Sequence, residues 1–383
     1  MATVTDRIRV AVAGLGAVAQ SIHLPLLERR WDLFEIVAVC DLSPALREAA
    51  GDRYGVTARQ QYVDVGEMIA KSDAHGVLLL TSGSHAPATH DALRHGVPVF
   101  CEKPLAFTVA EADELAAAAG AGRAGLLLAY MKERDDAILR LRELLTRIDD
   151  VRGVEVRVLH PSGESQLAFA NLQPPPRDLS QGTVARLRSE AEALLDVAVG
   201  RQAPQRLRQL YEKVVVSSLI HNTSLLRSLF GGIAEVDDVR VWPDDAFPPS
   251  VQISGTLRGG ARTVVAWHYL QDYPAYRETL TVHHARGSME VTFATPYLLN
   301  APTTLDVVEA AGHAGTSVKT STHRFTTSSF ESELVEFHRM VTEDAVPLSG
   351  IAEGRADIIT SQRIIRRLAE QQGVPIGGEA ATV

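Results

Sequence analysis

Near the start of this sequence, a hydrophobic strand over residues 8–13 runs directly into a glycine-rich turn. The turn has the pattern GxGxxA. Gly14 permits the tight turn, Gly16 lets a pyrophosphate approach the backbone, and the small Ala19 allows close packing of the following helix. This combination is typical of the strand–turn–helix unit that binds dinucleotides. The residues predicted to hold the dinucleotide at this turn are Gly14, Gly16, Ala17, Val18 and Ala19.

An acidic residue follows the second apolar run of the sequence. Residues 35–40 form this run, and Asp41 ends it about twenty residues beyond Ala19, the position of the ribose-binding acid in such units. A carboxylate that accepts hydrogen bonds from a ribose diol repels a phosphate at the same oxygen, so Asp41 favours NAD over NADP. Arg47 lies one helical turn further on and keeps NADP open as the alternative cofactor.

Strands and helical patterns alternate one by one over the first third of the chain. This rhythm predicts βαβ units and therefore a doubly wound parallel α/β sheet. The capping box formed by Thr108 and Glu111 marks the start of an alanine-rich helix. The predicted strands are residues 8–13, 35–40, 76–81, 97–101 and 126–130.

Beyond residue 130, helices and strands occur in blocks, which predicts an α+β domain built on a large, mainly antiparallel open sheet. We therefore predict a Rossmann domain over residues 1–129 and a substrate-binding domain over residues 130–383. A long helix is expected to carry Ser217 and His221, and residues 377–383 are expected to be frayed. The strands expected here are residues 154–159, 236–241, 251–257, 263–269, 278–284 and 288–293, and the last five are spaced like a meander.

Composition excludes several classes of partner. The net charge is −9 and basic blocks are absent from the sequence, which argues against nucleic acid and anionic membranes as partners. Residues 1–9 lack the apolar core of a signal peptide, and the sequence has no apolar run long enough to span a bilayer. We therefore expect a cytoplasmic protein that acts on small molecules. Cys40 and Cys101 lie in predicted strands without metal-ligand spacing.

The segment Glu102-Lys103-Pro104 follows the strand at residues 97–101. Together with the GxGxxA turn, His85 and a helix bearing His221, it makes the chain resemble the glucose-fructose oxidoreductase and inositol dehydrogenase family, called Gfo/Idh/MocA. The resemblance runs along nearly the whole chain. It implies a Rossmann domain followed by a domain whose sheet packs against its copy, and hence a homodimer or homotetramer.

The resemblance also implies roles for two residues. Lys103 matches the family lysine that lies between the nicotinamide and the substrate and assists proton transfer, and His221 matches a substrate-facing histidine. A partly desolvated lysine beside a positive ring is expected to have a lowered pKa, as proton transfer requires. The family aspartate one turn before the histidine is replaced by Ser217, which departs from the pattern. Ser217 and His221 are expected to share a helix face and to bind a substrate hydroxyl or carbonyl.

Other residues are assigned to the site by their positions. His85 follows the end of a strand, the edge at which doubly wound sheets bind ligands, and its loop with Ser82 is expected to contact the cofactor, as is Glu102. Tyr130 is a candidate for substrate binding. Tyr211 and Lys132 are further substitutes for the missing aspartate. The sequence has no metal-ligand framework, and the adjacent histidines at 283 and 284 would face opposite sides of a strand.

The leading hypothesis is an NAD(P)-dependent oxidoreductase that moves a hydride between nicotinamide and a carbinol or keto carbon of a sugar, cyclitol or similar polyhydroxylated substrate. Two alternatives stay open. One is an enzyme that retains its cofactor and uses transient oxidation for elimination or glycoside cleavage. The other is a regulator that senses NAD(P) or a ligand, which the replacement of the family aspartate by Ser217 favours.

Overall fold

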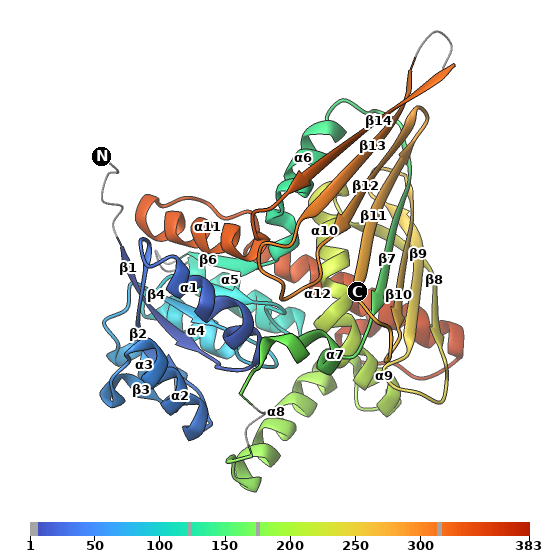
Figure 1. The fold of residues 1–383 in the computed structure, drawn as a ribbon. Helices are drawn as coiled ribbons and strands as arrows, with labels where there is room; N and C mark the ends of the chain where they lie inside the picture. The colour runs from blue at the N-terminus through green and yellow to red at the C-terminus, as the bar shows by residue number, and fades with distance from the viewer. Residues whose placement is uncertain (1–6, 121–124, 174–176, 312–315) are drawn as a thin grey trace, which may run out of the picture. The chain divides into compact units, whose positions relative to one another are not determined.

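The computed structural model describes residues 7–120, 125–173, 177–311 and 316–383 (Figure 1). The chain forms two compact units, and each is assembled from several segments. The predicted boundary between a cofactor-binding and a substrate-binding domain, at residues 129 and 130, stays a prediction. The first unit comprises Met1–Tyr130, Ala170–Arg201 and Glu333–Ile359, and the second comprises Met131–Phe169, Gln202–Ser332 and Thr360–Val383.

The first unit contains a six-stranded parallel sheet in the order β3-β2-β1-β4-β5-β6. This is the strand order of a doubly wound dinucleotide-binding sheet, so the predicted fold class is confirmed for this part. Its central strands are apolar on both faces, as expected of a parallel sheet covered by helices. The strands are β1 (Ile8–Ala13), β2 (Phe34–Cys40), β3 (Gln61–Tyr62), β4 (Gly76–Leu79), β5 (Val99–Glu102) and β6 (Leu126–Ala129).

Several helices of the first unit begin at residues whose side chains cap them. Ser43 accepts a hydrogen bond from the Leu46 N–H at the start of α2, and Gly55 ends that helix with φ +71°. The predicted capping box is confirmed, because Glu111 N–H donates to Thr108 Oγ1 and Thr108 N–H donates to Glu111 Oε2. These helices are α1 (Leu24–Arg29), α2 (Pro44–Tyr54), α3 (Val65–Lys71), α4 (Ala86–Arg94), α5 (Val109–Gly120) and α8 (Gln181–Val199).

The second unit contains an eight-stranded sheet in the order β14-β13-β12-β11-β7-β10-β9-β8. All pairs are antiparallel except β7 with β10, so the mainly antiparallel sheet is confirmed. The expected meander is interrupted, because β7 lies between β10 and β11. The strands are β7 (Val151–His160), β8 (Ile233–Trp242), β9 (Ser250–Leu257), β10 (Arg262–Tyr269), β11 (Arg277–His284), β12 (Gly287–Phe293), β13 (Thr303–Ala311) and β14 (Ser317–Phe325).

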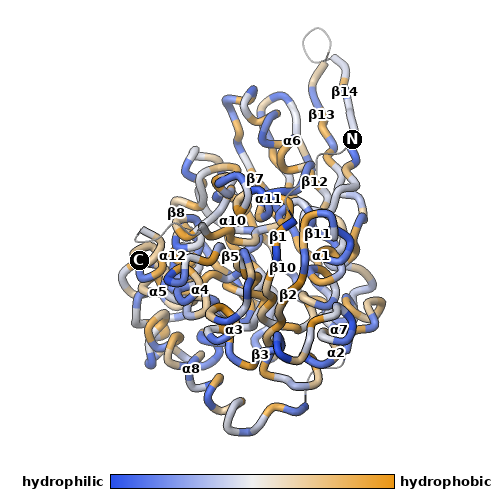
Figure 2. Tube along the Cα trace, turned by 90° about the vertical axis from the view of Figure 1, so that its left-hand side faces the viewer, coloured by the Kyte–Doolittle hydropathy of each residue, from blue (hydrophilic) through white to orange (hydrophobic). Residues whose placement is uncertain are grey.

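Strands β13 and β14 extend this sheet beyond the strands expected from the sequence. Alternation along β13 buries Thr303, Leu305 and Val307 on one face, whereas most residues of β14 are exposed. Along β13 and β14, which pair with each other, hydrophilic and hydrophobic residues both occur (Figure 2). The helices α6 (Asp136–Leu145), α7 (Gly163–Leu167), α9 (Gln205–Leu210) and α10 (Ile220–Phe230) complete the second unit, and α11 (Ser329–Glu343) and α12 (Ile351–Gln372) contain residues of both units.

The end of the chain is ordered, which corrects the expectation that residues 377–383 are frayed. Glu379–Ala381 form a 3₁₀ turn, and Ala380 is fully buried. Gln362 on α12 donates a hydrogen bond of 2.6 Å to Glu379, which holds this turn on the helix. Such a contact with the preceding helix leaves no recognisable pattern in the terminal residues. Among the described residues, no helix combines the length and apolar composition that crossing a bilayer requires.

Candidate functional site

The turn after β1 has the conformation that the GxGxxA pattern predicts. Gly14 has φ +89°, and a Cβ at this position would lie 2.5 Å from the backbone carbonyl carbon of Leu80. Only glycine fits there without displacing the backbone. At Gly16, an added Cβ would meet no atom of the described residues within 4 Å, so the backbone faces open space. Helical structure begins at Ala17, and Ala19 is buried against the sheet.

Asp41 is held against this turn by hydrogen bonds from the backbone. Its Oδ2 accepts from the Leu15 N–H at 2.8 Å, and its Oδ1 accepts from the Ser43 N–H at 2.8 Å. The guanidinium of Arg47 donates to the backbone carbonyl of Asp41. Each carboxylate oxygen can accept a further hydrogen bond, as a ribose hydroxyl would require.

These residues fit a dinucleotide at the point where the strand order of the sheet reverses. β1 pairs with β2 on one side and with β4 on the other, which is the switch point at which doubly wound sheets bind ligands. The turn glycine, the open backbone at Gly16 and the acid after β2 all lie at the carboxyl ends of these strands. The structure therefore brings together the predicted cofactor-binding residues Gly14, Gly16, Ala17, Val18, Ala19 and Asp41.

Glu102, at the end of β5, links the lysine segment to the helix that follows the turn. Its Oε1 accepts a hydrogen bond of 3.0 Å from His23 Nε2, and its Oε2 accepts from the Lys103 N–H at 3.1 Å. Burial by itself would raise the pKa of Glu102, but the hydrogen bond from His23 and the positive charges of His23 and Lys103 outweigh burial and lower it. Glu102 is therefore an anion beside the half-buried Lys103, which precedes a cis peptide bond to Pro104.

His85 holds the segment after Lys103 through its side chain. It is 2% exposed, and its Nδ1–H donates to the carbonyl of Pro104 at 2.7 Å. Burial lowers the pKa of His85, so this ring is neutral near pH 7. Ser84 in the same loop donates to Glu111 at 2.6 Å, and Ser82 is exposed. These contacts give His85 a positioning role, and the cofactor contact expected of His85 and Ser82 stays a prediction.

One group of three possible metal ligands occurs among the described residues. It consists of His23, Glu102 and Glu333, whose ligand atoms lie within 4.8 Å of one another. His23 Nε2 and Glu102 Oε1 already share a hydrogen bond, which accounts for the close approach of these two residues. We assign no ion to this group. The adjacent histidines at 283 and 284 do not take part in it.

In the second unit, Ser217 and His221 lie on a continuous helical segment whose middle part differs from the expected α-helix. Residues Tyr211–Leu219 are π-helical, and α10 begins at Ile220. The wider turn of a π-helix changes the angular relation that an α-helical spacing predicts, and π-helical turns frequently occur at functional sites. The Ser217 hydroxyl donates to the Lys213 carbonyl, and His221 is half-buried at the second residue of α10.

A buried carboxylate fixes the helix that carries His221. Glu278 on β11 is fully buried and accepts hydrogen bonds from Lys132 Nζ at 2.6 Å, from Asn222 Nδ2 at 2.8 Å and from the Tyr276 hydroxyl. Burial and the neighbouring Glu278 charge raise the pKa of Tyr276 well above its ordinary value, so its hydroxyl stays a donor. Asn222 directly follows His221, and this cluster therefore holds the start of α10.

The remaining candidates from the sequence are mostly buried. Tyr130 is 1% exposed and Tyr211 is fully buried. Lys132 is engaged by both oxygens of Glu278, and its ammonium lies 5.4 Å from the centre of the Phe293 ring. The substrate contact proposed for Tyr130 stays a prediction.

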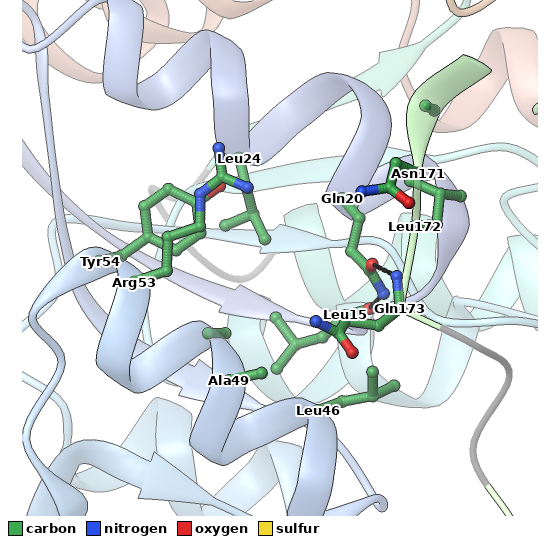
Figure 3. A pocket seen from close by; sticks show the side chains of 12 residues that line it. Leu15, Gln20, Leu24, Leu46, Ala49, Arg53, Tyr54, Asn171, Leu172 and Gln173 are labelled. Atoms are coloured by element: carbon green, nitrogen blue, oxygen red, sulfur yellow. Dashed lines mark hydrogen bonds between the residues drawn. The ribbon is translucent and has the colours of Figure 1, made fainter.

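A pocket in the first unit is lined by residues that the sequence analysis did not connect (Figure 3). The Gln173 N–H donates to Gln20 Oε1 at 2.9 Å, and Gln20 Nε2 donates to the carbonyl of Leu15 in the glycine turn at 2.8 Å. Segment Ala170–Gln173 therefore lies over the turn. No local pattern in the sequence indicates this contact. The same holds for the contact of His23 with Glu102 and for that of Lys132 with Glu278.

Comparisons with known proteins find a family model and relatives that are similar to the first part of the chain. The model of the Gfo/Idh/MocA family, described as an oxidoreductase family with an NAD-binding Rossmann fold, matches residues 8–128. Inositol 2-dehydrogenase of Burkholderia ambifaria (strain MC40-6) is 34% identical over 140 residues, which cover 36% of this chain and 41% of that protein. The chain thus matches about two fifths of the length of this curated relative.

Solved structures resemble the chain over nearly its whole length. An aldose-aldose oxidoreductase from Caulobacter crescentus aligns with a TM-score of 0.71 at 17% identity, covering 97% of this chain and 99% of that one. A variant of KijD10, a 3-ketoreductase from Actinomadura kijaniata in complex with TDP-benzene and NADP, aligns with a TM-score of 0.69 at 14% identity, covering 94% and 97%. At these identities the likeness concerns the fold, and it confirms the predicted combination of a Rossmann sheet with a large, mainly antiparallel sheet.

Proposed function

We propose, from the match of residues 8–128 to the model of the Gfo/Idh/MocA family of oxidoreductases, that this chain is an NAD-dependent dehydrogenase or reductase. Its substrate is a sugar, a cyclitol or a similar polyhydroxylated molecule that reacts at a carbinol or keto carbon. The observation that carries the proposal is the arrangement of the glycine turn, Asp41 and the Glu102–Lys103 segment at the carboxyl ends of β1, β2 and β5 in one parallel sheet.

The cofactor is held by residues of the first unit. Gly14 and Gly16 leave the backbone open for a pyrophosphate, and Asp41 accepts hydrogen bonds from the ribose hydroxyls. When bound, the nicotinamide supplies the acceptor or donor of hydride. The carboxylate of Asp41 favours NAD, because a 2′-phosphate would bring a second negative charge next to it.

Lys103 is the residue to which we assign proton transfer. Its backbone N–H is fixed by Glu102, and the segment that follows is fixed by His85 through Pro104. These contacts restrict the lysine backbone, and a general acid or base must be well positioned to be effective. Lys103 donates a proton to the substrate oxygen during reduction and accepts it during oxidation.

His221 is assigned to the reacting oxygen of the substrate. Its helix is anchored by the hydrogen bond from Asn222 to Glu278 and by the ion pair of 2.7 Å between Arg227 and Glu133. Ser217 supplies a hydroxyl where the family pattern has an aspartate. A carboxylate at position 217 would favour the charged form of His221, and a hydroxyl does not. We propose that His221 binds substrate as a hydrogen-bonding imidazole.

A turnover screen tests the proposed function. The purified protein is denatured to identify any nicotinamide it releases, and the native protein is then assayed at 340 nm with sugars, cyclitols and their keto forms. Substrate-dependent formation or consumption of NADH supports the proposal. Product formation without net change in NADH identifies an enzyme that recycles a retained cofactor. Binding of neither NAD nor NADP contradicts the proposal.

A further inference from the structure

A segment far along the chain contacts the proposed cofactor site at two points, on either side of residues 174–176. On one side, the Gln173 N–H bonds to Gln20, which in turn bonds to the glycine turn (Figure 3). On the other side, Asp178 bonds to the start of α2, more than 130 positions earlier in the sequence. All of these residues belong to the first unit.

Asp178 places a carboxylate directly beside the residues that follow Asp41. Its Oδ2 accepts a hydrogen bond of 2.8 Å from the Ser43 hydroxyl and one of 3.1 Å from the Ala45 N–H. The hydrogen bonds from Ala45 and Ser43 lower the pKa of Asp178, so it is an anion at neutral pH. The positive end of the α2 helix dipole stabilises an anion at this place.

The donors that a phosphate would need here are already used by carboxylates. The Ser43 N–H donates to Asp41, and the Ser43 hydroxyl and the Ala45 N–H donate to Asp178. The next amide, that of Leu46, donates to Ser43 Oγ. In a Rossmann unit, the acid after the second strand contacts the ribose 2′-hydroxyl, so these donors surround the position that a 2′-phosphate would take.

We propose that Asp178 is a second determinant of cofactor choice, which rejects the 2′-phosphate of NADP from outside the Rossmann segment. This inference rests on the proposed function, because it assumes that the glycine turn binds a nicotinamide dinucleotide. Asp178 acts in two ways: its charge repels the phosphate, and its oxygen holds the Ser43 and Ala45 donors that a phosphate would need.

Arg47 explains why substitution of Asp178 alone should measurably change the affinity for NADP. Its charge lowers the pKa of Asp178, so the two side chains interact, and its guanidinium also donates to the carbonyl of Asp41. Arginine is well suited to bind a phosphate. Removal of the Asp178 charge leaves Arg47 without this nearby anion, so that it can pair with a 2′-phosphate, and Asp178→Ala in addition vacates the donors of Ser43 and Ala45.

The experiment measures the dissociation constants of NAD and NADP by calorimetry for the full-length protein and for Asp178→Asn and Asp178→Ala. Because two like charges a few ångströms apart near a protein surface repel measurably, we expect NADP to bind about tenfold more tightly in both variants. NAD affinity should change by about twofold or less, since the ribose contacts of Asp41 remain.

Asp52→Asn is the matched control. It removes one negative charge from the exposed surface of the same helix, at the end opposite Ser43, and should leave the ratio of the two affinities unchanged. The inference is overturned if Asp178→Asn and Asp178→Ala leave that ratio unchanged, or if the control shifts it equally. If the unaltered protein binds neither dinucleotide, the proposed function fails first, and the inference fails with it.

Discussion

The proposed cofactor region of the first unit and the Glu278 cluster of the second unit are both built around carboxylates, but they are assembled differently. Asp41 is held mainly by backbone N–H groups of the loops next to it. Glu278 is held by side chains, with Lys132 146 positions and Asn222 56 positions away in the sequence. The first arrangement follows from a short motif, whereas the second exists only after β11, α10 and the residues after Tyr130 have packed together.

The difference also concerns what each carboxylate does. Asp41 is only partly buried, and we expect its loss to affect cofactor recognition. Glu278 is fully buried and neutralises the ammonium of Lys132, so its loss leaves an uncompensated charge inside the protein. Substitutions in the first region should therefore change binding and rate, and substitutions in the second should change the free energy of unfolding.

The largest effect is expected for Lys103→Ala. Loss of a positioned acid–base group lowers turnover by about 10²–10⁴-fold, while the bound nicotinamide is retained. Turnover is measured at 340 nm and cofactor affinity by calorimetry. Lys71→Ala removes an exposed lysine of the same unit and should leave both unchanged. Nearly full turnover of Lys103→Ala with cofactor bound would show that this lysine does not transfer the proton.

The second prediction contrasts two lysine–carboxylate pairs with the same N–O distance of 2.6 Å. Glu278→Leu leaves the Lys132 ammonium buried without its partner and should lower the free energy of unfolding by about 3–5 kcal/mol. Glu67→Gln breaks the exposed pair with Lys71 and should have little effect, because water screens that pair. Urea unfolding measures both variants, and equal losses would contradict the assigned role of burial.

The third and smallest effect concerns Asp135, also in the second unit. Burial raises the pKa of Asp135 to about 6, although hydrogen bonds from Thr303 and the Ala137 N–H act in the opposite direction. Because this pKa is higher in the folded protein than in the unfolded chain, the folded state loses stability as pH rises from about 4 to about 6. The loss is at most about 3 kcal/mol.

Asp135→Asn removes this pH dependence, because asparagine does not ionise while its one side-chain oxygen still accepts from the Ala137 N–H and its amide can donate to the Thr303 hydroxyl. Relative to the unaltered protein, the variant should gain stability between pH 4 and pH 7, as measured by chemical denaturation at both values. Asp64→Asn is the control, because Asp64 also caps a helix but is exposed. An equal gain in the control would show that the effect does not come from burial of Asp135.

The parts of the structure that were predicted from the sequence share a local origin. The strand at residues 8–13, the strand at residues 35–40 and the Thr108 capping box were all identified from neighbouring residues and all occur in the structure. Periodicity also indicated six strands of the second sheet, β7 to β12. Strands β13 and β14 were missed, because β14 is largely polar and exposed and lacks a clear apolar alternation.

Other features could not be predicted because they depend on packing between distant segments. The position of β7 between β10 and β11 follows from its register with both strands, which no spacing in the sequence encodes. The π-helical residues before His221 have an ordinary apolar pattern that an α-helix would equally satisfy. The ordered end of the chain is held by Gln362, through a contact that a terminal sequence does not reveal.

The sequence alone was sufficient to predict a dinucleotide turn followed by an acid after the second strand, because both depend on a few adjacent residues and on backbone geometry that glycine dictates. The role expected of Lys103 came from the family resemblance and stays a prediction. Only the tertiary structure decided which residues support these segments. Asp178 meets Ser43, His23 meets Glu102, and a buried glutamate anchors the helix of His221. These contacts join residues that are about 50 to 150 positions apart, so their free energy exists only in the folded chain.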